Sequence, residues 1–316
     1  MWNTELTKLL NIEYPIIQGG MAHISDAKLA AAVRSAGGAG VMASGGFSVD
    51  EVRKNIKLYK DIMGKNQCFG VNIMIKAPNK DDILQLVCDE KVPFVTLAAG
   101  DASPYFSTLQ TNGIKCIPLT TTLKSAIYMQ EKGADALILE GMESGGHDGK
   151  ITIMSLMQNI VPSIKIPIIA AGGIVDGKGI AAALILGASG VQIGTRFLIS
   201  EECAIHENAK NAIINATDTD STVTGFSTAA SVRGLKNKFS ENYISKEYNG
   251  ASQSELDSLA TGTLEKGMLQ GDIENGYVLA GMSLVQLNKI LPAKEIVKEL
   301  IYETELALNK APNLIW

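Results

Sequence analysis

Short apolar runs alternate with amphipathic stretches along most of the chain. Eight runs suit strands that are buried on both faces, and they begin at intervals of roughly 20 to 30 residues, the repeat of consecutive β/α units. The runs cover residues 14–18, 40–44, 69–73, 94–98, 115–120, 136–140, 167–171 and 191–194. This alternation predicts an α/β fold and favours a closed TIM (β/α)8 barrel. Because spacing alone does not prove closure, an open doubly wound sheet is the alternative.

The stretches between the runs carry helix signals. Ser48 and Glu51 have the spacing of a capping box, and apolar residues then recur on one helical face. Ser103 is expected to cap a helix that begins with a proline, and Asp176 to cap another that stops before Gly187. These helices lie between predicted strands, as a barrel requires.

The alternation changes after Phe197. Residues 201–275 contain polar stretches of helical character at 202–216, 229–239 and 254–266, and no convincing strand. We therefore predict a helical insertion at 201–275, between the eighth strand and a last barrel helix at 294–308. The barrel would then comprise residues 1–200 and 276–316. An insertion at this point emerges from the face where barrel active sites form, so it could be a lid; a dimerisation or structural appendage is equally compatible with the sequence.

Composition narrows the functional class. The chain has 316 residues, of which 46% are hydrophobic and 19% charged, as in an ordinary folded enzyme. Its net charge of −5 gives no basic field for nucleic acid. The four cysteines have no CxxC spacing, which argues against a zinc site and fits reduced thiols. No signal-peptide core and no membrane-length apolar run are present, so we expect a soluble, cytoplasmic protein without a metal site or a membrane partner.

The sixth run is followed by a loop with three close glycines, Gly145, Gly146 and Gly149, and one histidine, His147. Loops at the carboxyl ends of parallel strands carry the chemistry of such folds, so His147 is the candidate catalytic residue. A histidine that only bonds to the backbone is the simpler alternative. The glycine-rich ends of other strands favour the catalytic interpretation.

Two consecutive strand ends predict a phosphate site. Gly172 and Gly173 end the seventh run, and Gly194 and Thr195 end the eighth. In phosphate-binding barrels these two loops supply backbone N–H donors, and glycine allows a close approach. A pair of tight turns is the structural alternative. The neighbouring Arg196 could reach the phosphate or form an ion pair on the barrel rim.

Other polar residues stand where a ligand would lie. Asn72 interrupts the third apolar run, and Glu140 ends the sixth; when buried, such side chains must be paired or face a ligand. The chain has no Ser-His-Asp arrangement, no HExxH and no dinucleotide-binding GxGxxG followed by an acidic residue. Nucleophilic hydrolysis and a Rossmann-type site are therefore not supported.

These motifs resemble a known family. YPIIQGGM at 14–21, GVNIM at 70–74, EGMESGGH at 140–147, AAGGI at 170–174 and GTRF at 194–197 are similar to those of the FMN-dependent enoyl-acyl-carrier-protein reductase II family, of the FabK type. The resemblance runs over nearly the whole chain and includes Arg233, Lys236 and Asn237. It extends to the related nitronate monooxygenases, which share the barrel, the flavin and the histidine loop.

The resemblance implies a set of site residues. FMN would lie across the carboxyl ends of the strands, with its phosphate on Gly172, Gly173, Gly194 and Thr195. The residues that would line its ribityl chain and ring are Gly20, Met21, Ala22, Asn72, Glu140, Gly145 and Gly146. His147 would stand beside the ring and face the substrate.

The implied reaction is the last step of the fatty-acid elongation cycle. NADH or NADPH would reduce the flavin, which would return a hydride to the β-carbon of a trans-2-enoyl thioester on acyl carrier protein. His147 would donate a hydrogen bond or proton to the thioester oxygen, a role suited to its near-neutral ordinary pKa. A homodimer is the usual form of the family, and some relatives need a monovalent cation.

Two other functions stay open at this point. One is a nitronate monooxygenase, in which His147 acts as a base on a nitroalkane and the reduced flavin passes electrons to oxygen. The other is a barrel that binds a phosphorylated ligand without redox chemistry. The basic residues Arg233, Lys236 and Lys238 could meet the carrier protein or the nicotinamide diphosphate, but a solvated helix face is the simpler interpretation.

Overall fold

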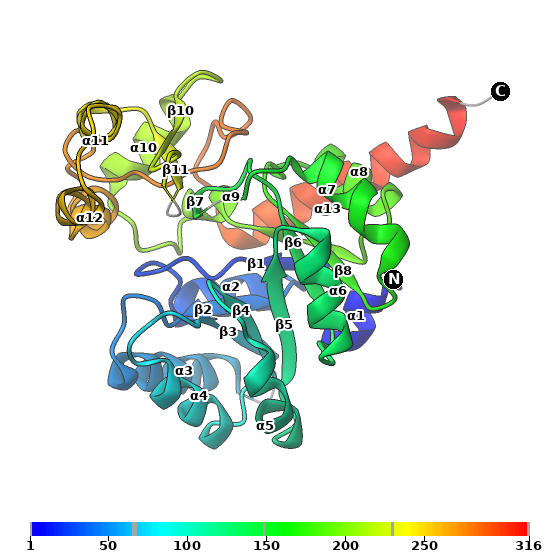
Figure 1. Cartoon of the computed structure of the whole chain (residues 1–316). Helices are drawn as coiled ribbons and strands as arrows, with labels where there is room; N and C mark the ends of the chain where they lie inside the picture. Colours follow the sequence, from blue (N-terminus) through cyan, green and yellow to red (C-terminus); the bar gives the residue numbers. More distant parts are fainter. Residues whose placement is uncertain (1, 65–67, 148, 229–230, 315–316) are drawn as a thin grey trace.

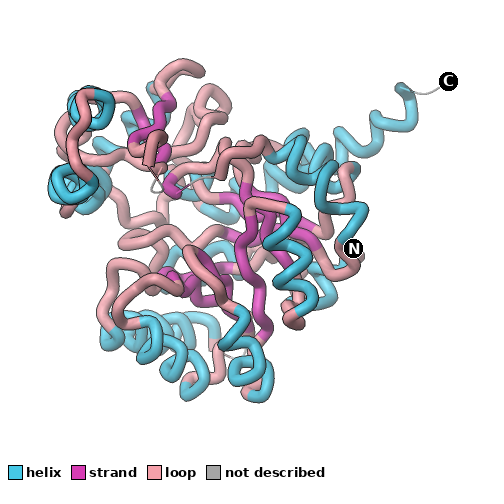
Figure 2. The backbone as a smooth tube through the Cα atoms, viewed as in Figure 1, coloured by secondary structure: helices cyan, strands magenta, loops and turns pink. Residues whose placement is uncertain are grey.

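Eight parallel strands form a barrel in a computed structural model that describes residues 2–64, 68–147, 149–228 and 231–314 (Figures 1 and 2). The ring closes between its first two strands, where the Gln18 N–H donates to the Ala39 carbonyl and the Ala39 N–H donates to the Ile16 carbonyl, both at 2.9 Å. The predicted closed TIM barrel is confirmed. The barrel strands are β1 (Ile16–Gln18), β2 (Gly40–Ala43), β3 (Phe69–Met74), β4 (Phe94–Ala98), β5 (Lys115–Thr120), β6 (Leu137–Glu140), β8 (Ile168–Ala171) and β9 (Gly190–Ile193).

Burial on both faces explains why the strands read as continuous apolar runs. Ile17, Val41, Ile117, Ile138 and Ile169 belong to one buried cluster, together with apolar residues of the first helix, α1 (Glu5–Leu10). The alternate strand residues pack in a second, larger cluster with the surrounding helices. This inside–outside alternation is the usual packing of a (β/α)8 barrel.

Helices surround the strands (Figure 2). The Ser48–Glu51 capping box is present, and the Asp176 carboxylate accepts from the Gly179 N–H at 2.8 Å, so both predicted caps are confirmed. The helices of the ring are α2 (Ala27–Ser35), α3 (Val49–Met63), α4 (Lys80–Asp89), α5 (Phe106–Thr111), α6 (Leu123–Glu131), α7 (Ile153–Ile160), α8 (Gly177–Ile185) and α13 (Ala293–Lys310). Short 3-10 turns lie at Ser103–Tyr105, Val161–Ser163 and Ala311–Leu314.

One predicted cap is wrong. Ser103 does not cap a helix: it lies inside a 3-10 turn, and the following α-helix begins only at Phe106. The Asp101 carboxylate, two residues earlier, accepts from the Ser103 N–H at 3.0 Å, and the Ser103 hydroxyl lies 3.1 Å from the Tyr128 hydroxyl instead of bonding to a helix N–H.

The insertion after β9 is helical in part. A short helix, α9 (Thr195–Leu198), directly follows β9 and precedes the insertion. The helices of the insertion are α10 (Glu207–Asn215), α11 (Lys238–Tyr248), α12 (Gln253–Ala260) and a π-helical turn at Glu265–Leu269. The prediction that it lacks strands is wrong, because β10 (Ser221–Thr224) and β11 (Val232–Leu235) form an antiparallel pair there. The helix expected over 229–239 is therefore replaced in its described part by β11 and the start of α11.

A short strand in the loop after β6 explains this difference. Gly146 and His147 form β7, which pairs antiparallel with Arg233 and Val232 of β11. The insertion thus completes a three-stranded sheet with the loop that follows β6 (Figure 1). Such long-range pairing overrides local helical propensity.

In the described ranges, no helix is both long enough and apolar enough to cross a membrane. All four cysteines are free; Cys116 and Cys203 are buried, whereas Cys68 and Cys88 are half-buried. Burial raises the pKa of the Cys116 thiol to about 12 and that of Cys203 to about 11.

Close packing of α2 on β2 gives a stability prediction. A Cβ on Gly40 would overlap the Ala30 carbonyl, whereas a Cβ on Gly113 meets nothing within 4 Å, although Gly113 has a φ of +78°. We expect Gly40→Ala to lower the free energy of unfolding by at least about 2 kcal/mol through overpacking. Gly113→Ala should lower it by about 1 kcal/mol through backbone strain alone. Urea titrations of both variants check this, and equal losses would contradict it.

Candidate active site

The loop after β1 is held by two buried polar residues that the sequence analysis did not single out. The Gln18 amide donates to the Ser25 hydroxyl at 2.9 Å and its oxygen accepts from the Val41 N–H at 3.1 Å. The Ser25 hydroxyl in turn accepts from the Met21 N–H at 2.9 Å. These bonds fix the backbone of the predicted cofactor-binding stretch Gly20–Ala22 above the strand end.

Asn72 lies beside this loop. Its side chain is buried and donates to the Thr96 hydroxyl at 2.9 Å. A Cβ on Gly20 would overlap the Cβ of Asn72, so glycine allows the loop to rest directly on this residue. The structure thus brings together the predicted site residues of the loop after β1 and of β3.

The histidine loop is anchored at several points. The Glu143 carboxylate accepts from the Ile153 N–H at 2.9 and 3.0 Å and so supports the start of α7. The Glu143 carbonyl accepts from the Met282 N–H at 3.0 Å. A Cβ on Gly145 would lie 2.6 Å from the backbone of Ala280. The chain returning from the insertion therefore packs against this loop.

His147 itself is exposed and lies at the boundary between barrel and insertion. Its place is set by the β7–β11 pairing and by Arg233, which is buried and donates from Nε to the Met142 carbonyl at 2.9 Å. Arg233 therefore does not lie on a solvated helix face, which was the simpler interpretation of Arg233, Lys236 and Lys238. Lys236 and Lys238 are exposed and lie 3.8 and 3.3 Å from carboxylates of Glu241 and Glu274.

The two predicted phosphate turns lie at neighbouring strand ends, since β8 and β9 pair directly. Gly172 and Gly173 have φ values of +96° and +71°, and a Cβ on Gly172 would lie 2.9 Å from the Gly141 carbonyl oxygen. In the part of the chain that the structure describes, the N–H groups of these two glycines donate to no protein acceptor. Unpaired N–H groups on a concave turn are suited to an anion.

Both turns contact the chain that returns from the insertion. The Thr195 hydroxyl accepts from the Gly281 N–H at 3.0 Å, and the Ser283 hydroxyl donates to the Gly173 carbonyl at 2.7 Å. Gly281 therefore meets the turn that contains Thr195, whereas the Met282 side chain is exposed.

Three further polar atoms lack partners among the described residues: Thr120 Oγ1, Ser144 Oγ and Gln192 Oε1. Each is buried, and each belongs to a strand end or loop on the carboxyl side of the barrel. An unmade hydrogen bond in such a place costs about 1–3 kcal/mol, which a polar ligand would offset. Sequence reasoning missed all three, although Gln192 does interrupt the eighth apolar run.

Together these features fit a phosphorylated cofactor with a polar chain such as FMN. Glycine turns give close backbone approach, and unpaired buried oxygens stand in the same half of the barrel. Glu140 is half-buried and is in register with Ala171 of β8, so it too lies at this end. Across the described ranges, no group of three His, Cys, Asp or Glu side chains could hold a metal ion.

Arg196 does not belong to the anion site. It is buried and its guanidinium lies 3.2 Å from the Glu299 carboxylate of α13, which confirms the ion-pair interpretation. Burial lowers the pKa of Arg196, and Glu299 opposes this effect. The pair joins the eighth strand end to the last helix.

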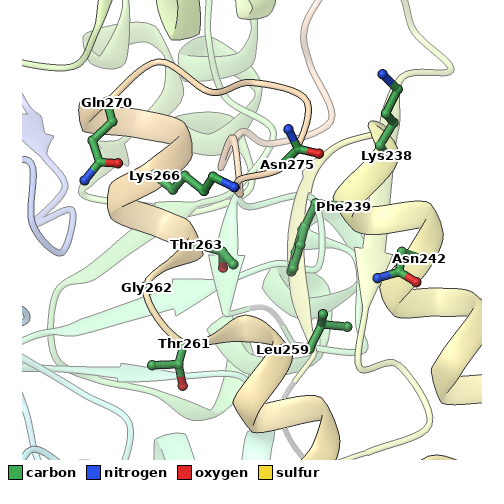
Figure 3. A pocket seen from close by; sticks show the side chains of 10 residues that line it. All are labelled: Lys238, Phe239, Asn242, Leu259, Thr261, Gly262, Thr263, Lys266, Gln270 and Asn275. Carbon is green, nitrogen blue, oxygen red and sulfur yellow. The ribbon is translucent and has the colours of Figure 1, made fainter.

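A separate hollow of about 670 Å³ lies on the insertion, between α11 and the stretch 259–275 (Figure 3). Phe239 and Leu259 form apolar parts of its wall, and Lys266 extends toward Asn275 (Figure 3). None of the predicted site residues lines it. The candidate active site therefore stays at the strand ends.

Unequal burial of the ion pair gives an asymmetric prediction. Glu299→Gln leaves a buried guanidinium without its carboxylate and should lower the free energy of unfolding by about 2 kcal/mol. Arg196→Met leaves the Glu299 carboxylate, which is 38% exposed and still 2.7 Å from the Lys289 ammonium. This variant should therefore lower the free energy of unfolding by less than about 1 kcal/mol. Both variants should retain FMN. Glu295→Gln, at an exposed pair on the same helix, is the control; loss of FMN from Arg196→Met would contradict the assignment.

Comparisons with known proteins agree with this geometry. A probable nitronate monooxygenase of Staphylococcus aureus (strain MSSA476) is 31% identical, over 95% of this chain and 97% of the relative. The structure of FabK from Thermotoga maritima is 38% identical and covers 100% of both chains with a TM-score of 0.96. That of a nitroalkane oxidase from Streptomyces ansochromogenes is 27% identical and covers 98% of this chain and 100% of that chain, with a TM-score of 0.87. The model of the nitronate monooxygenase family matches residues 3–303, and the chain belongs to this family.

Proposed function

We propose that the protein is an FMN-dependent reductase that uses NADH or NADPH to reduce trans-2-enoyl thioesters. The observation that carries the proposal is the match to FabK along the full length of both chains, at higher identity than the match to the nitroalkane oxidase. The motifs of this chain resemble the same reductase type. The unpaired polar groups at the strand ends support a bound phosphorylated cofactor.

The cofactor would be held mainly by backbone groups. Its phosphate would bind the turns of Gly172–Gly173 and Gly194–Thr195. Its ribityl chain and ring would lie along the predicted residues of β3 and β6 and of the loops after β1 and β6. Ser144, Thr120 and Gln192 add polar side chains to this set because their oxygens are buried and unpaired among the described residues. When bound, the flavin supplies the acceptance and delivery of a hydride.

The protein contributes position and proton control. Reduction at the β-carbon places negative charge on the thioester oxygen, and the His147 imidazole would donate a hydrogen bond or proton there. Its backbone is held by Val232 across β7 and β11, so the ring stands at a defined place on the rim. The insertion lies over this side of the barrel and would shield the reacting atoms from water (Figure 1).

The partners follow from the same proposal. The acyl group would arrive on acyl carrier protein, and the enzyme would act in the cytoplasm as a homodimer; a monovalent cation is a further proposed requirement. Neither nucleic acid nor a membrane has a part in the proposed reaction.

A second candidate is nitronate monooxygenase activity. It is favoured by the family model and by the names of the staphylococcal relatives. In that reaction His147 would remove a proton from a nitroalkane, and oxygen would be the final electron acceptor. Oxygen uptake with a nitroalkane, compared with anaerobic NADH oxidation driven by crotonyl-CoA, separates the two activities.

Removal of the imidazole tests the proposed role of His147. His147→Ala should lower the rate of crotonyl-CoA reduction roughly 10²- to 10³-fold because a proton or hydrogen-bond donor is lost. The FMN content per chain should not change. The control is His206→Asn, because His206 caps α10 through the Asn208 N–H and asparagine preserves a cap. Normal turnover in His147→Ala would refute the catalytic role.

A further inference from the structure

An aromatic side chain projects from the turn that joins β10 to β11. The Phe226 side chain is 51% exposed. The Lys150 ammonium lies 5.8 Å from the centre of its ring. Lys150 follows His147 by three residues, so the tip of the insertion hairpin meets the far end of the catalytic loop.

The turn that presents Phe226 is held by a buried carboxylate. Glu247 of α11 is only 8% exposed. It accepts from the Gly225 N–H at 2.9 Å, the Ser227 N–H at 2.7 Å and the Ser227 hydroxyl at 2.6 Å. Charge-assisted bonds on both sides of Phe226 define the path of the backbone there. The ring is therefore presented at a set position.

The hairpin and the catalytic loop form one unit. Val232 pairs with His147 across β11 and β7, directly after the hairpin turn. On its other side the catalytic loop approaches the end of β5, since a Cβ on Gly149 would lie 3.1 Å from the side chain of Thr121. Phe226 and Lys150 thus lie beside the strand pair and the loop that carry the exposed His147.

We propose that Phe226 and Lys150 bind the pantetheine arm of the thioester substrate. The assignment rests on the proposed reductase function. In coenzyme A and on acyl carrier protein, this arm is a long chain of methylene and amide groups that is joined to a phosphate at the end away from the thioester. The exposed ring supplies an apolar surface for the chain, and the ammonium supplies a charge for the phosphate. The thioester at the other end of the arm would then lie toward His147.

A nicotinamide cofactor also carries phosphates, so the two half-reactions are measured separately. In stopped-flow experiments the FMN-loaded enzyme is first reduced by NADH without oxygen, and reoxidation is then followed with crotonyl-CoA or with crotonyl-pantetheine, which lacks the phosphate. Phe226→Ala should raise the half-saturating concentration of both thioesters about tenfold through lost apolar contact. Phe226→Leu, which keeps an apolar side chain, should restore part of the affinity for both thioesters.

Lys150→Ala should raise the half-saturating concentration of crotonyl-CoA about threefold, as for an exposed ion pair, and leave that of crotonyl-pantetheine unchanged. Limiting reoxidation rates, reduction by NADH and FMN content should match those of the wild type. Calorimetric titration of the oxidised holoenzyme with crotonyl-CoA should give the same ranking of affinities. The controls are Tyr248→Ala and Lys238→Ala, which remove exposed side chains of α11, away from Phe226 and Lys150 in the chain.

Each contrary result has its own meaning. Failure of crotonyl-CoA to reoxidise the reduced wild-type enzyme overturns the proposed function and this assignment with it. Reoxidation of the wild type, with unchanged half-saturation in Phe226→Ala and Lys150→Ala, overturns the assignment alone. An effect confined to the reduction by NADH also overturns the assignment and indicates that the two side chains bind the nicotinamide cofactor.

Discussion

The backbone pairing between β7 and β11 determines where the candidate catalytic residue lies. Two residues of the loop after β6, Gly146 and His147, pair with two residues of an insertion hairpin more than 80 positions later in the chain. Arg233 reinforces this pairing from a buried position by donating to the Met142 carbonyl. A loop that would otherwise be mobile on the barrel rim becomes the edge of a small sheet. The geometry of the site therefore depends on the insertion as much as on the barrel.

The barrel contributes a different kind of constraint. Its closed ring brings glycine turns from several strand ends to one side of the barrel. Buried side chains such as Asn72 and Gln18 are satisfied by neighbouring strands and hold these turns in place. Others, such as Ser144 and Thr120, have unpaired oxygens among the described residues. Such groups reduce the stability of the free protein and would gain partners from a bound polar ligand.

The sequence was sufficient to predict those elements whose signals lie within a few neighbouring residues. The eight barrel strands follow their apolar runs to within a residue or two because both faces of each strand are buried. The Ser48 and Asp176 caps were predictable because a side chain bonds to a backbone group three residues away. β11 was not predicted: it pairs with β10 and also with β7, and nothing near Val232 in the chain reveals the pairing with β7. For the same reason the role of Gln18 emerges only when β1 and β2 are seen together, because its side chain accepts from the Val41 N–H. The family resemblance identified the expected cofactor and residues, but it did not reveal how the insertion holds His147.

The central claim is that a flavin at these strand ends passes a hydride to an enoyl thioester. The most direct measurement is a single turnover: the purified, FMN-loaded protein is reduced by NADH under argon, one equivalent of crotonyl-CoA is added, and the flavin spectrum and products are recorded. The account predicts full return of the oxidised spectrum and one equivalent of butyryl-CoA. A flavin that stays reduced until oxygen is admitted, with crotonyl-CoA recovered unchanged, would contradict it.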